Sequence, residues 1–187
     1  MKIVLASASP RRRELLKKIA DNFTVDPAVG EELAEKGLTP AQTACRLAEH
    51  KCDEVFARHS GDAEEVLVVA CDTIVVFDGK ILGKPKDVAD AVRTLTALSG
   101  NDHLVITAVC VRSHKGKRVD FAETKVTFNR LSPEFIESYV KGGSPMDKAG
   151  SYGIQDGGIV ASYEGSYENV VGLPLELTKK LIDEISL

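Results

Sequence analysis

The chain opens with Ile3-Val4-Leu5-Ala6-Ser7-Ala8-Ser9-Pro10-Arg11-Arg12-Arg13-Glu14-Leu15-Leu16, a stretch typical of a strand, a tight turn and the start of a helix. The apolar run at its beginning predicts a buried strand. Ser9 is a favourable N-cap, and Pro10 suits the first helical position because the N–H that proline lacks would have no helical partner there. The sequence therefore begins as an α/β unit.

The same turn is suited to bind an anion. Ser7 and Ser9 place hydroxyl groups beside the backbone N–H groups of the helix start, where the helix dipole favours negative charge. Arg11, Arg12 and Arg13 add positive charge and forked donors that match phosphate oxygens. We therefore expect a phosphate site near the start of the chain.

Helices and strands alternate along the rest of the sequence. The continuous apolar run Val66-Leu67-Val68-Val69-Ala70 predicts a strand buried on both faces, and Asp78-Gly79 predicts a two-residue hairpin. The pattern predicts an α/β fold with a mixed sheet flanked by helices. The expected helices cover about 10–20, 39–58, 88–98, 133–140 and 174–185, and the expected strands about 3–6, 23–25, 66–70, 75–77, 80–82, 104–111, 121–128 and 159–163.

Length and composition fit one globular domain covering residues 1–187. The net charge of −4 gives no overall attraction to nucleic acid or to an anionic membrane, so we expect neither as a partner. No apolar run approaches the roughly 20 residues of a membrane span, and the start of the chain does not resemble a signal peptide. Its cysteines lack metal-type spacing and are expected to be reduced, as in a cytoplasmic protein: Cys45, Cys52, Cys71 and Cys110.

Asp72 follows the most apolar run of the chain and is expected at the end of that strand. An isolated buried carboxylate is costly, so it must be paired, bound to a metal or placed at the edge of a cleft. One interpretation is a structural aspartate that accepts hydrogen bonds from backbone amides in a turn. The other is a metal-binding or catalytic carboxylate.

Lys51 is informative because of helix geometry. At about 100° per residue, the apolar residues of its helix form one stripe, and Lys51 falls at the centre of that stripe. An ammonium group on a buried face needs an anionic partner. It either extends to solvent or forms a structural salt bridge, or it points at a phosphate or an active-site carboxylate. The stripe consists of Ala44, Leu47, Ala48 and Val55.

Other polar motifs are weaker indications of function on their own. Lys84 follows the predicted hairpin, and Glu31-Glu32 lie in an acidic loop. Charged residues in such loops are often only solvated. The glycine-rich loop 142–158 is more informative, because long loops inside compact domains are usually functional or disordered, and its isoleucine and tyrosine favour order. The histidines have no metal-ligand spacing, and no Gly-x-Ser-x-Gly, Walker-type or dinucleotide motif is present.

A series of segments, in order and spanning almost the whole chain, resembles the Maf family of nucleoside triphosphate pyrophosphatases. Each segment alone is a weak signal, and their order makes the resemblance specific. They are Leu5-Ala6-Ser7-Ala8-Ser9-Pro10-Arg11-Arg12 with Glu14-Leu15-Leu16, the Glu31-Glu32 loop, Leu47-Ala48-Glu49-His50-Lys51, Cys71-Asp72-Thr73-Ile74-Val75, Leu82-Gly83-Lys84-Pro85, Leu98-Ser99-Gly100 with His103 and Thr107-Ala108-Val109, Met146-Asp147-Lys148-Ala149-Gly150-Ser151-Tyr152-Gly153-Ile154-Gln155, and Val171-Gly172-Leu173-Pro174-Leu175.

The resemblance implies a fold similar to that of inosine triphosphate pyrophosphatases, with two lobes around a cleft. It implies hydrolysis between the α- and β-phosphates of a nucleoside triphosphate, with a divalent cation, Mg²⁺ or Mn²⁺. Asp72 matches the catalytic acidic residue of the family, and Glu32 and Asp72 would hold the metal. The other polar positions of the family fall on Ser7, Arg11, Arg12, Lys51 and Lys84, whose cations would neutralise the triphosphate.

Three positions resemble the branch of the family that acts on dTTP and UTP: Arg11, Thr73 and Gln155. The glutamine amide offers one donor and one acceptor, which match the N3–H and O4 edge of thymine or uracil. The chain departs from the family at Asp156, where glycine is common, and at Gly30-Glu31-Glu32, where Val-Asp-Glu is usual. Expected roles are cleaning of the nucleotide pool, with a link to cell division arrest, and a homodimer is compatible with the resemblance.

Two other functions fit parts of the sequence. An apolar strand that ends in aspartate is also typical of phosphatases with an aspartyl nucleophile, but those enzymes need a second acid two residues later, where this chain has Ile74. A non-catalytic nucleotide-binding regulator of cell division is the other alternative. Such a binder has no obvious need for the acid pair Glu32 and Asp72 beside four cations.

Overall fold

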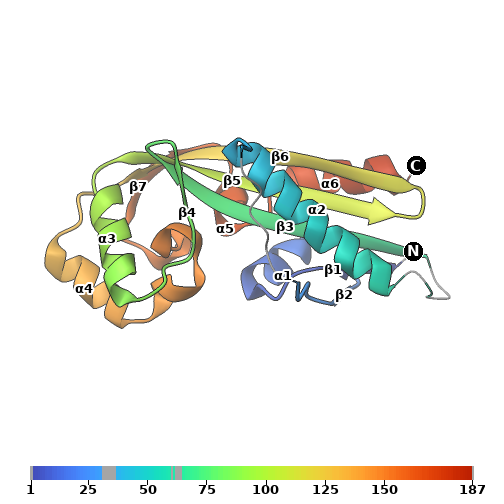
Figure 1. The fold of residues 1–187 in the computed structure, drawn as a ribbon, viewed down its shortest axis with the longest axis horizontal. Helices are drawn as coiled ribbons and strands as arrows, with labels where there is room; N and C mark the ends of the chain where they lie inside the picture. The colour runs from blue at the N-terminus through green and yellow to red at the C-terminus, as the bar shows by residue number, and fades with distance from the viewer. Residues whose placement is uncertain (1, 31–36, 60, 62–64, 187) are drawn as a thin grey trace. The chain divides into compact units, whose positions relative to one another are not determined.

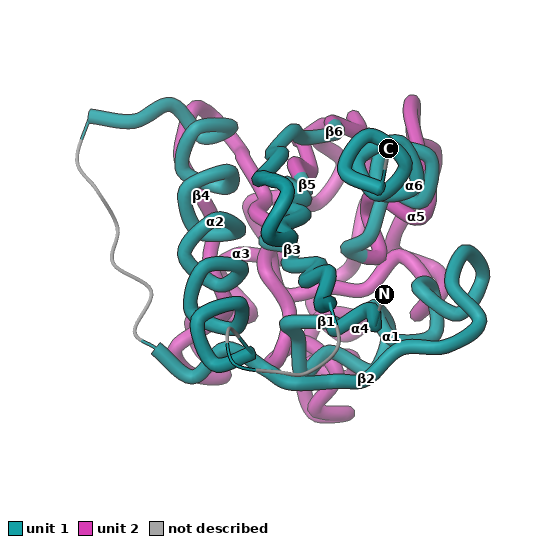
Figure 2. The backbone as a smooth tube through the Cα atoms, turned by 90° about the vertical axis from the view of Figure 1, so that its right-hand side faces the viewer, with its two compact units in different colours: residues 1–72, 107–122, 172–187 teal, residues 73–106, 123–171 magenta. Residues whose placement is uncertain are grey.

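The computed structural model describes residues 2–30, 37–59, 61 and 65–186. Its contacts divide the chain into two compact units, drawn in different colours in Figure 2. Unit 1 comprises residues 1–72, 107–122 and 172–187, and unit 2 comprises residues 73–106 and 123–171. Glu31 and Glu32, which the sequence places in an acidic loop, lie outside the described residues.

The strands of the described residues form a mixed sheet in the order β2-β1-β3-β5-β6-β7, with β4 paired to β3. β1 pairs in parallel with β2 and with β3, while β3–β4 and β6–β7 are antiparallel. The predicted α/β fold with a mixed sheet is thereby confirmed. The strands are β1 (Lys2–Leu5), β2 (Phe23–Val25), β3 (Val66–Phe77), β4 (Lys80–Leu82), β5 (Asp102–Ser113), β6 (Gly116–Phe128) and β7 (Val160–Glu164).

Unit 1 contains helices α1 (Pro10–Leu16), α2 (Pro40–Arg58) and α6 (Leu175–Ser186). α2 and α6 flank the strands of this unit on opposite sides (Figures 1 and 2). The predicted start of α2 is confirmed, because Thr39 and Gln42 form a reciprocal capping box that satisfies two otherwise unpaired amides. This firm start fixes the phase of the helix, and therefore which side chains face the sheet.

Unit 2 contains helices α3 (Val88–Leu98), α4 (Pro133–Lys141) and α5 (Tyr167–Val171) and the 3₁₀ helices η1 (Ser144–Asp147), η2 (Ala149–Ser151) and η3 (Ile154–Asp156). α3 packs against α4, η1 and η2. The predicted glycine-rich loop is thus ordered as a series of short turns. One apolar core joins these elements: Val75, Ala91, Leu95, Leu98, Val105, Val126, Phe128, Ile136, Val140, Tyr152 and Ile159.

Two predicted elements differ from the structure in ways that affect the site. α1 ends at Leu16 rather than near residue 20, and Lys18 and Ile19 donate instead to carbonyls three residues back. The chain must turn there, because Phe23 pairs with Ile3 in the parallel β1–β2 ladder. A helix this short has a weak dipole, so anion binding at its start depends on side chains more than we expected.

The second difference concerns Asp72, which was predicted at the end of a strand. β3 continues through Asp72 to Phe77, and Asp72 is only 6% exposed. The prediction placed a strand end there because the continuous apolar run stops at Asp72, and it required a partner for the buried carboxylate. The structure meets that requirement with a charged partner instead of a turn.

Further differences are smaller. α5 was not predicted, and β5 and β6 are longer than expected, meeting at the turn of His114 and Lys115. The Asp78-Gly79 hairpin is confirmed, and both residues have positive φ, 48° and 70°, as a tight two-residue turn requires. Among the described residues, no helix combines the length and apolarity needed to cross a bilayer.

Candidate active site

The predicted phosphate turn follows directly on β1 in unit 1. β1 ends at Leu5, opposite Val69 of β3, so the turn begins beside the strand that carries Asp72. Ser7 is buried, and its Oγ accepts hydrogen bonds from the backbone N of Ser9 (3.2 Å) and from Nη1 of Arg12 (3.3 Å). The Ser7 hydroxyl and the Arg12 guanidinium are therefore held together in one turn.

Arg12 has a second anchor that the sequence did not reveal. Its Nε donates to the backbone carbonyl of Gly172 at 2.8 Å, so residues 160 positions apart in the chain are joined. Gly172 is buried and has a φ of 118°, a conformation that favours glycine. The segment Val171-Gly172-Leu173-Pro174-Leu175 resembled the family without a role, and the Gly172 carbonyl supplies one: it orients the Arg12 side chain.

Lys51 and Asp72 form a direct ion pair. The helix α2 buries Ala44, Ala48 and Val55 and places the Lys51 side chain toward β3. Lys51 Nζ lies 2.5 Å from Asp72 Oδ1, and the two side chains are 19% and 9% exposed. Of the partners considered for Lys51 from the sequence, the structure selects a carboxylate, and this pairing is what allows Asp72 to stay inside a buried strand.

The pKa of Cys71, the residue before Asp72, reflects the charges around this ion pair. Burial raises the pKa of the Cys71 thiol to about 11, and the nearby Arg12 guanidinium and Lys51 ammonium oppose that rise. The thiol therefore stays protonated at neutral pH and is a poor nucleophile. Arg12, Lys51 and Asp72 therefore all act electrostatically on the Cys71 thiol. All of the cysteines are free, as predicted.

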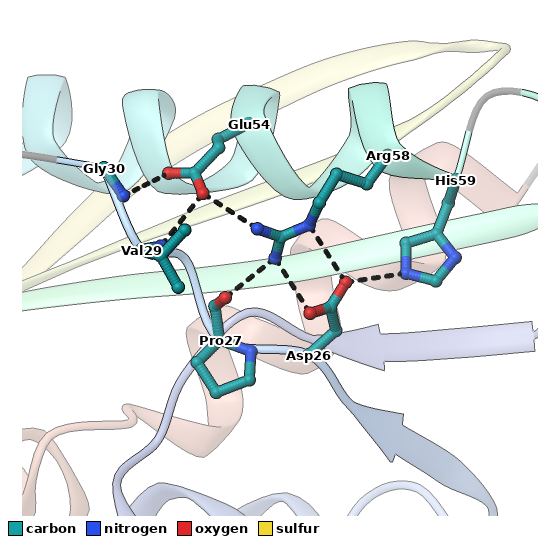
Figure 3. Close-up of polar contacts among 7 residues, drawn as sticks. All are labelled: Asp26, Pro27, Val29, Gly30, Glu54, Arg58 and His59. Carbon is teal, nitrogen blue, oxygen red and sulfur yellow. Dashed lines mark hydrogen bonds and ion pairs between the residues drawn. The ribbon is translucent and has the colours of Figure 1, made fainter.

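A second polar network on α2 holds the segment that precedes the acidic loop (Figure 3). The Glu54 carboxylate accepts from the backbone N of Val29 (2.9 Å) and of Gly30 (3.0 Å). The approach is close, since a Cβ on Gly30 would lie 2.9 Å from Glu54 Oε2, and a larger residue would make the Glu54 side chain shift. The hydrogen bond from Val29 N is the main reason that the pKa of Glu54 is lowered.

Arg58, one turn further along α2, completes this network. Its guanidinium contacts both Asp26 carboxylate oxygens (2.8 and 3.2 Å), Glu54 Oε1 (2.9 Å) and the Pro27 carbonyl (2.7 Å). His59 Nε2 lies 3.0 Å from Asp26 Oδ2. The helix that carries Lys51 thus also fixes residues 26–30, which lead in sequence to Glu31 and Glu32. No local sequence pattern indicates the contacts between residues 54–59 and residues 26–30, because their partners are separated by 24 to 33 positions.

Unit 2 carries the other predicted residues, Thr73, Lys84 and Gln155. Thr73 is half-buried in β3, whereas Lys84 and Gln155 are exposed. Gly150 N donates to Gly83 O at 3.1 Å, so the turn of Lys84 is tied to the start of the segment that carries Gln155. The approach is close, and a Cβ on Gly150, whose φ is 69°, would lie 2.9 Å from the side chain of Val75.

His103 lies buried in unit 2 against this same segment. Its Nε2 is 2.7 Å from the Tyr152 hydroxyl, and its ring packs edge-on against Phe128 and Tyr152. Burial lowers the pKa of His103 to about 4, opposed by the charge of Asp102. The imidazole is therefore neutral at physiological pH and serves as a buried core group.

The structure thus brings together some of the predicted residues within each unit. In unit 1 it joins Ser7 to Arg12 and Lys51 to Asp72, and Arg11 is half-buried in the first turn of α1. Glu32 lies outside the described residues, so a metal pair with Asp72 stays a prediction. Among residues 2–30, 37–59, 61 and 65–186, no three His, Cys, Asp or Glu side chains cluster as metal ligands.

A family model described as Maf-like protein matches residues 2–185. The chain belongs to the Maf family. Proteins named dTTP/UTP pyrophosphatase are similar to this Maf protein over most of its length. The relative from Moorella thermoacetica is 46% identical over 97% of this chain and 93% of its own, and the relative from Thermococcus gammatolerans is 45% identical over 96% and 94%.

Solved structures resemble this Maf protein more loosely. The Staphylococcus aureus Ham1 protein is 15% identical with a TM-score of 0.42, over 68% of this chain and 72% of its own. A nucleoside-triphosphatase, or dITP/XTP pyrophosphatase, from Mycobacterium abscessus is 17% identical with a TM-score of 0.40, over 70% and 76%.

Proposed function

We propose that this protein is a nucleoside triphosphate pyrophosphatase that hydrolyses dTTP and UTP to the nucleoside monophosphate and pyrophosphate. The structural observation that carries the proposal is the part-buried Lys51–Asp72 pair, together with the Arg12–Ser7 turn, which follows the strand that pairs with β3. Support also comes from relatives named for this activity, which match along nearly the full chain at 40–46% identity. We propose the cytoplasm as its location, and a homodimer stays a prediction.

Positive side chains on firm supports suit the triphosphate. Arg12 is anchored by two hydrogen bonds to Gly172 and Ser7, so its guanidinium is held in place before substrate binds. We assign Arg11, Arg12, Lys51 and Lys84 to the phosphate oxygens. Because phosphoryl transfer needs little covalent help from the protein, fixed positive charge and positioning would supply most of the barrier reduction.

The donor chemistry around Asp72 fits a divalent cation bound together with substrate. Mg²⁺ and Mn²⁺ prefer hard oxygen ligands and commonly use one or two carboxylates plus substrate phosphates. Asp72 supplies one carboxylate, and we propose that Glu32 supplies the second. When bound, the cation would neutralise charge on the α- and β-phosphates as a Lewis acid.

Asp72 is the proposed general base. Its carboxylate would orient a water molecule and accept a proton from it as the water oxygen forms a bond to the α-phosphorus. The bond from that phosphorus to the α,β-bridging oxygen then breaks, and pyrophosphate leaves with the electron pair. Lys51 orients the Asp72 carboxylate through their ion pair, and an ionised carboxylate is the form that accepts a proton.

We assign base recognition to Gln155, with Thr73 and Arg11 as the other positions that match the dTTP/UTP branch. The Gln155 amide can donate to O4 and accept from N3–H of thymine or uracil. Cytosine presents the opposite pattern on this edge, with an acceptor at N3 and a donor at position 4. A Gln155 amide held in one orientation would therefore favour uracil over cytosine without reference to the sugar, whereas the flipped amide would match cytosine.

A panel of nucleotides, incubated with the protein and Mg²⁺ or Mn²⁺ and analysed for phosphate products, tests the proposal. We expect pyrophosphate plus dTMP or UMP from dTTP and UTP. Orthophosphate as the first product would favour an aspartyl phosphatase. Nucleotide binding without turnover of any nucleotide would favour the non-catalytic regulator.

A further inference from the structure

Asp156, at which the chain departs from the usual family pattern, lies at the end of η3, directly after Gln155. In the structure its Oδ2 accepts hydrogen bonds from two hydroxyl groups within unit 2. Tyr139 Oη, on α4, lies 2.5 Å away, and Ser144 Oγ, on η1, lies 2.7 Å away. One carboxylate oxygen therefore ties η3 to two other elements.

Both hydroxyl groups are themselves held in place. The Tyr139 hydroxyl accepts from the backbone N of Gly153 at 3.2 Å, two residues before Gln155. Ser144 receives hydrogen bonds from Lys148 Nζ at its carbonyl (2.5 Å) and at its hydroxyl (3.0 Å). The turn that carries Gln155 is thus held by hydrogen bonds on both sides, at Gly153 and at Asp156.

The Tyr139 side chain is held in place by packing. Its ring stacks on Phe135 of the same helix, with centroids 6.3 Å apart and planes within 7°. Burial and the hydrogen bond to Asp156 raise the pKa of the Tyr139 hydroxyl, so that it stays a donor at neutral pH. The hydroxyl can therefore donate to Asp156 while it accepts from Gly153 N.

The Gln155 side chain lies over this fastened turn. A Cβ on Gly153 would be 2.6 Å from Gln155 Nε2 and 2.9 Å from Asp156 Oδ2, so both side chains rest against the Gly153 backbone. Asp156 N also donates to Gly153 O at 3.0 Å, which closes the turn around Gln155. The position of the Gln155 amide is therefore coupled to the position of the Asp156 carboxylate.

We propose that Asp156 is a positioning residue for base recognition: it fixes the η3 turn so that the Gln155 amide is oriented before a pyrimidine nucleotide binds. The inference rests on the proposed function, and it assigns no chemical step to Asp156. An amide that is already ordered loses less entropy on binding, so the effect should appear in KM and in selectivity between bases. A purely structural role would lower stability and leave that selectivity unchanged.

The test compares kinetics on UTP and CTP, which differ only at the base. In Asp156→Ala we expect KM for UTP to rise about ten-fold, as for loss of one or two hydrogen bonds, with kcat changed by no more than about three-fold. The ratio of kcat/KM for UTP over CTP should fall. Asp156→Asn retains a carbonyl acceptor for Tyr139, and we expect it to restore most of the KM and most of the ratio.

Two further variants complete the design. Tyr139→Phe removes the donor and the Gly153 acceptor while keeping the ring, and it should reproduce the Asp156→Ala kinetics even if Asp156→Ala folds poorly. Glu137→Ala removes an exposed carboxylate from the same helix and should behave as wild type.

The possible failures are distinguishable. Absence of pyrophosphate release from UTP and dTTP by the wild-type protein would overturn the proposed function itself. An active wild type whose Asp156→Ala and Tyr139→Phe variants keep the normal KM and the normal UTP-to-CTP ratio would overturn only the inference about Asp156. An Asp156→Asn variant as impaired as Asp156→Ala would also overturn it, because the shared acceptor would then be irrelevant.

Discussion

The two units support their predicted site residues by different physical means. In unit 1 most supports are ionic and lie on long regular elements: Lys51 on α2 pairs with Asp72 on β3, and Glu54 and Arg58 bind the segment after β2. Arg12 is the exception, held by the Ser7 hydroxyl and the Gly172 carbonyl. In unit 2 the segment of Gln155 consists of short 3₁₀ turns. There the segment is held by hydrogen bonds from hydroxyl groups, backbone amides and a neutral imidazole. Asp156 and Lys148 are the charged residues that take part in these hydrogen bonds.

This difference matches most of the proposed assignments: the phosphates fall mainly to unit 1, with Lys84 of unit 2, and the base mainly to unit 2, with Arg11 of unit 1. A triphosphate is a concentrated charge, and fixed cations on rigid elements bind it strongly with little need for a particular orientation. A pyrimidine edge is neutral and is identified by the direction of hydrogen bonds, which requires a well-positioned amide. We therefore expect losses in unit 1 to abolish turnover or stability, and losses in unit 2 to alter selectivity.

The largest effect should come from removing the charge on Asp72 alone. Asp72→Asn keeps the shape of the side chain and an acceptor for Lys51, but an amide cannot accept the proton of the attacking water. We expect kcat for dTTP to fall at least ~100-fold, the scale of a general-base contribution. Steady-state kinetics measure the loss. Asp183→Asn, on the exposed face of α6, is the matched control, and near-normal turnover by Asp72→Asn would refute the assignment.

Removing the other member of the ion pair, Lys51, should have a smaller effect, on stability. Lys51→Met keeps the length and apolar character of the stem but leaves the Asp72 carboxylate buried without its ammonium partner. We expect the free energy of unfolding to fall by about 3 kcal/mol, as for other buried pairs that lose one member. Equilibrium denaturation in urea measures the change.

The double variant Lys51→Met/Asp72→Asn sharpens this experiment. With no charge left to bury, it should recover most of the lost stability and yet remain inactive, because the proposed base is gone. If the double variant were no more stable than Lys51→Met, the ion pair would not be the reason that Asp72 can lie within β3.

Mild acid should weaken unit 2 through its neutral imidazole. The folded pKa of His103 is about 4, below the ordinary value of 6.5, so the unfolded chain takes up a proton first as the pH falls. The stability contributed by the neutral ring is complete above pH 6.5 and is lost as the pH falls toward 4. Between pH 7.5 and 5 the loss should be about 2 kcal/mol.

Urea unfolding at several pH values checks this expectation, with His103→Gln and His50→Gln compared. The first variant should flatten the dependence on pH between 6.5 and 4. The second removes an exposed histidine of α2 and should leave it as steep as in the wild type. Equal slopes in all three proteins would show that His103 is not the group responsible.

The sequence predicted local features well wherever neighbouring residues decide them. The Thr39 capping box, the Asp78-Gly79 hairpin and the helix of Lys51 all follow from residues within a few positions of one another. The need of Lys51 for an anionic partner also followed from helix phase. Its partner Asp72, 21 positions away, was among the candidates but could not be selected.

Features that depend on distant partners were missed. The strand was predicted to end at Asp72 because its neutralising cation comes from another element. The Arg12–Gly172 bond and the contacts of Arg58 with Asp26 join residues 160 and 32 positions apart, and no local pattern encodes such pairs. Asp156 was noticed only as a departure, since its hydroxyl partners lie 12 and 17 positions away.

The course of the chain between the two units has a consequence for how new specificities could be built. The chain passes from one unit to the other between residues 72 and 73, 106 and 107, 122 and 123, and 171 and 172. The first three of these points fall inside β3, β5 and β6 rather than in loops. A graft of unit 2, to which we assign most of the base recognition, from another family member must therefore exchange residues 73–106 and 123–171 together and splice within continuous strands. Recombination at loops cannot exchange unit 2 as a whole. Base selectivity in this fold should therefore diversify by point substitutions, for example at Asp156, rather than by exchange of a whole unit.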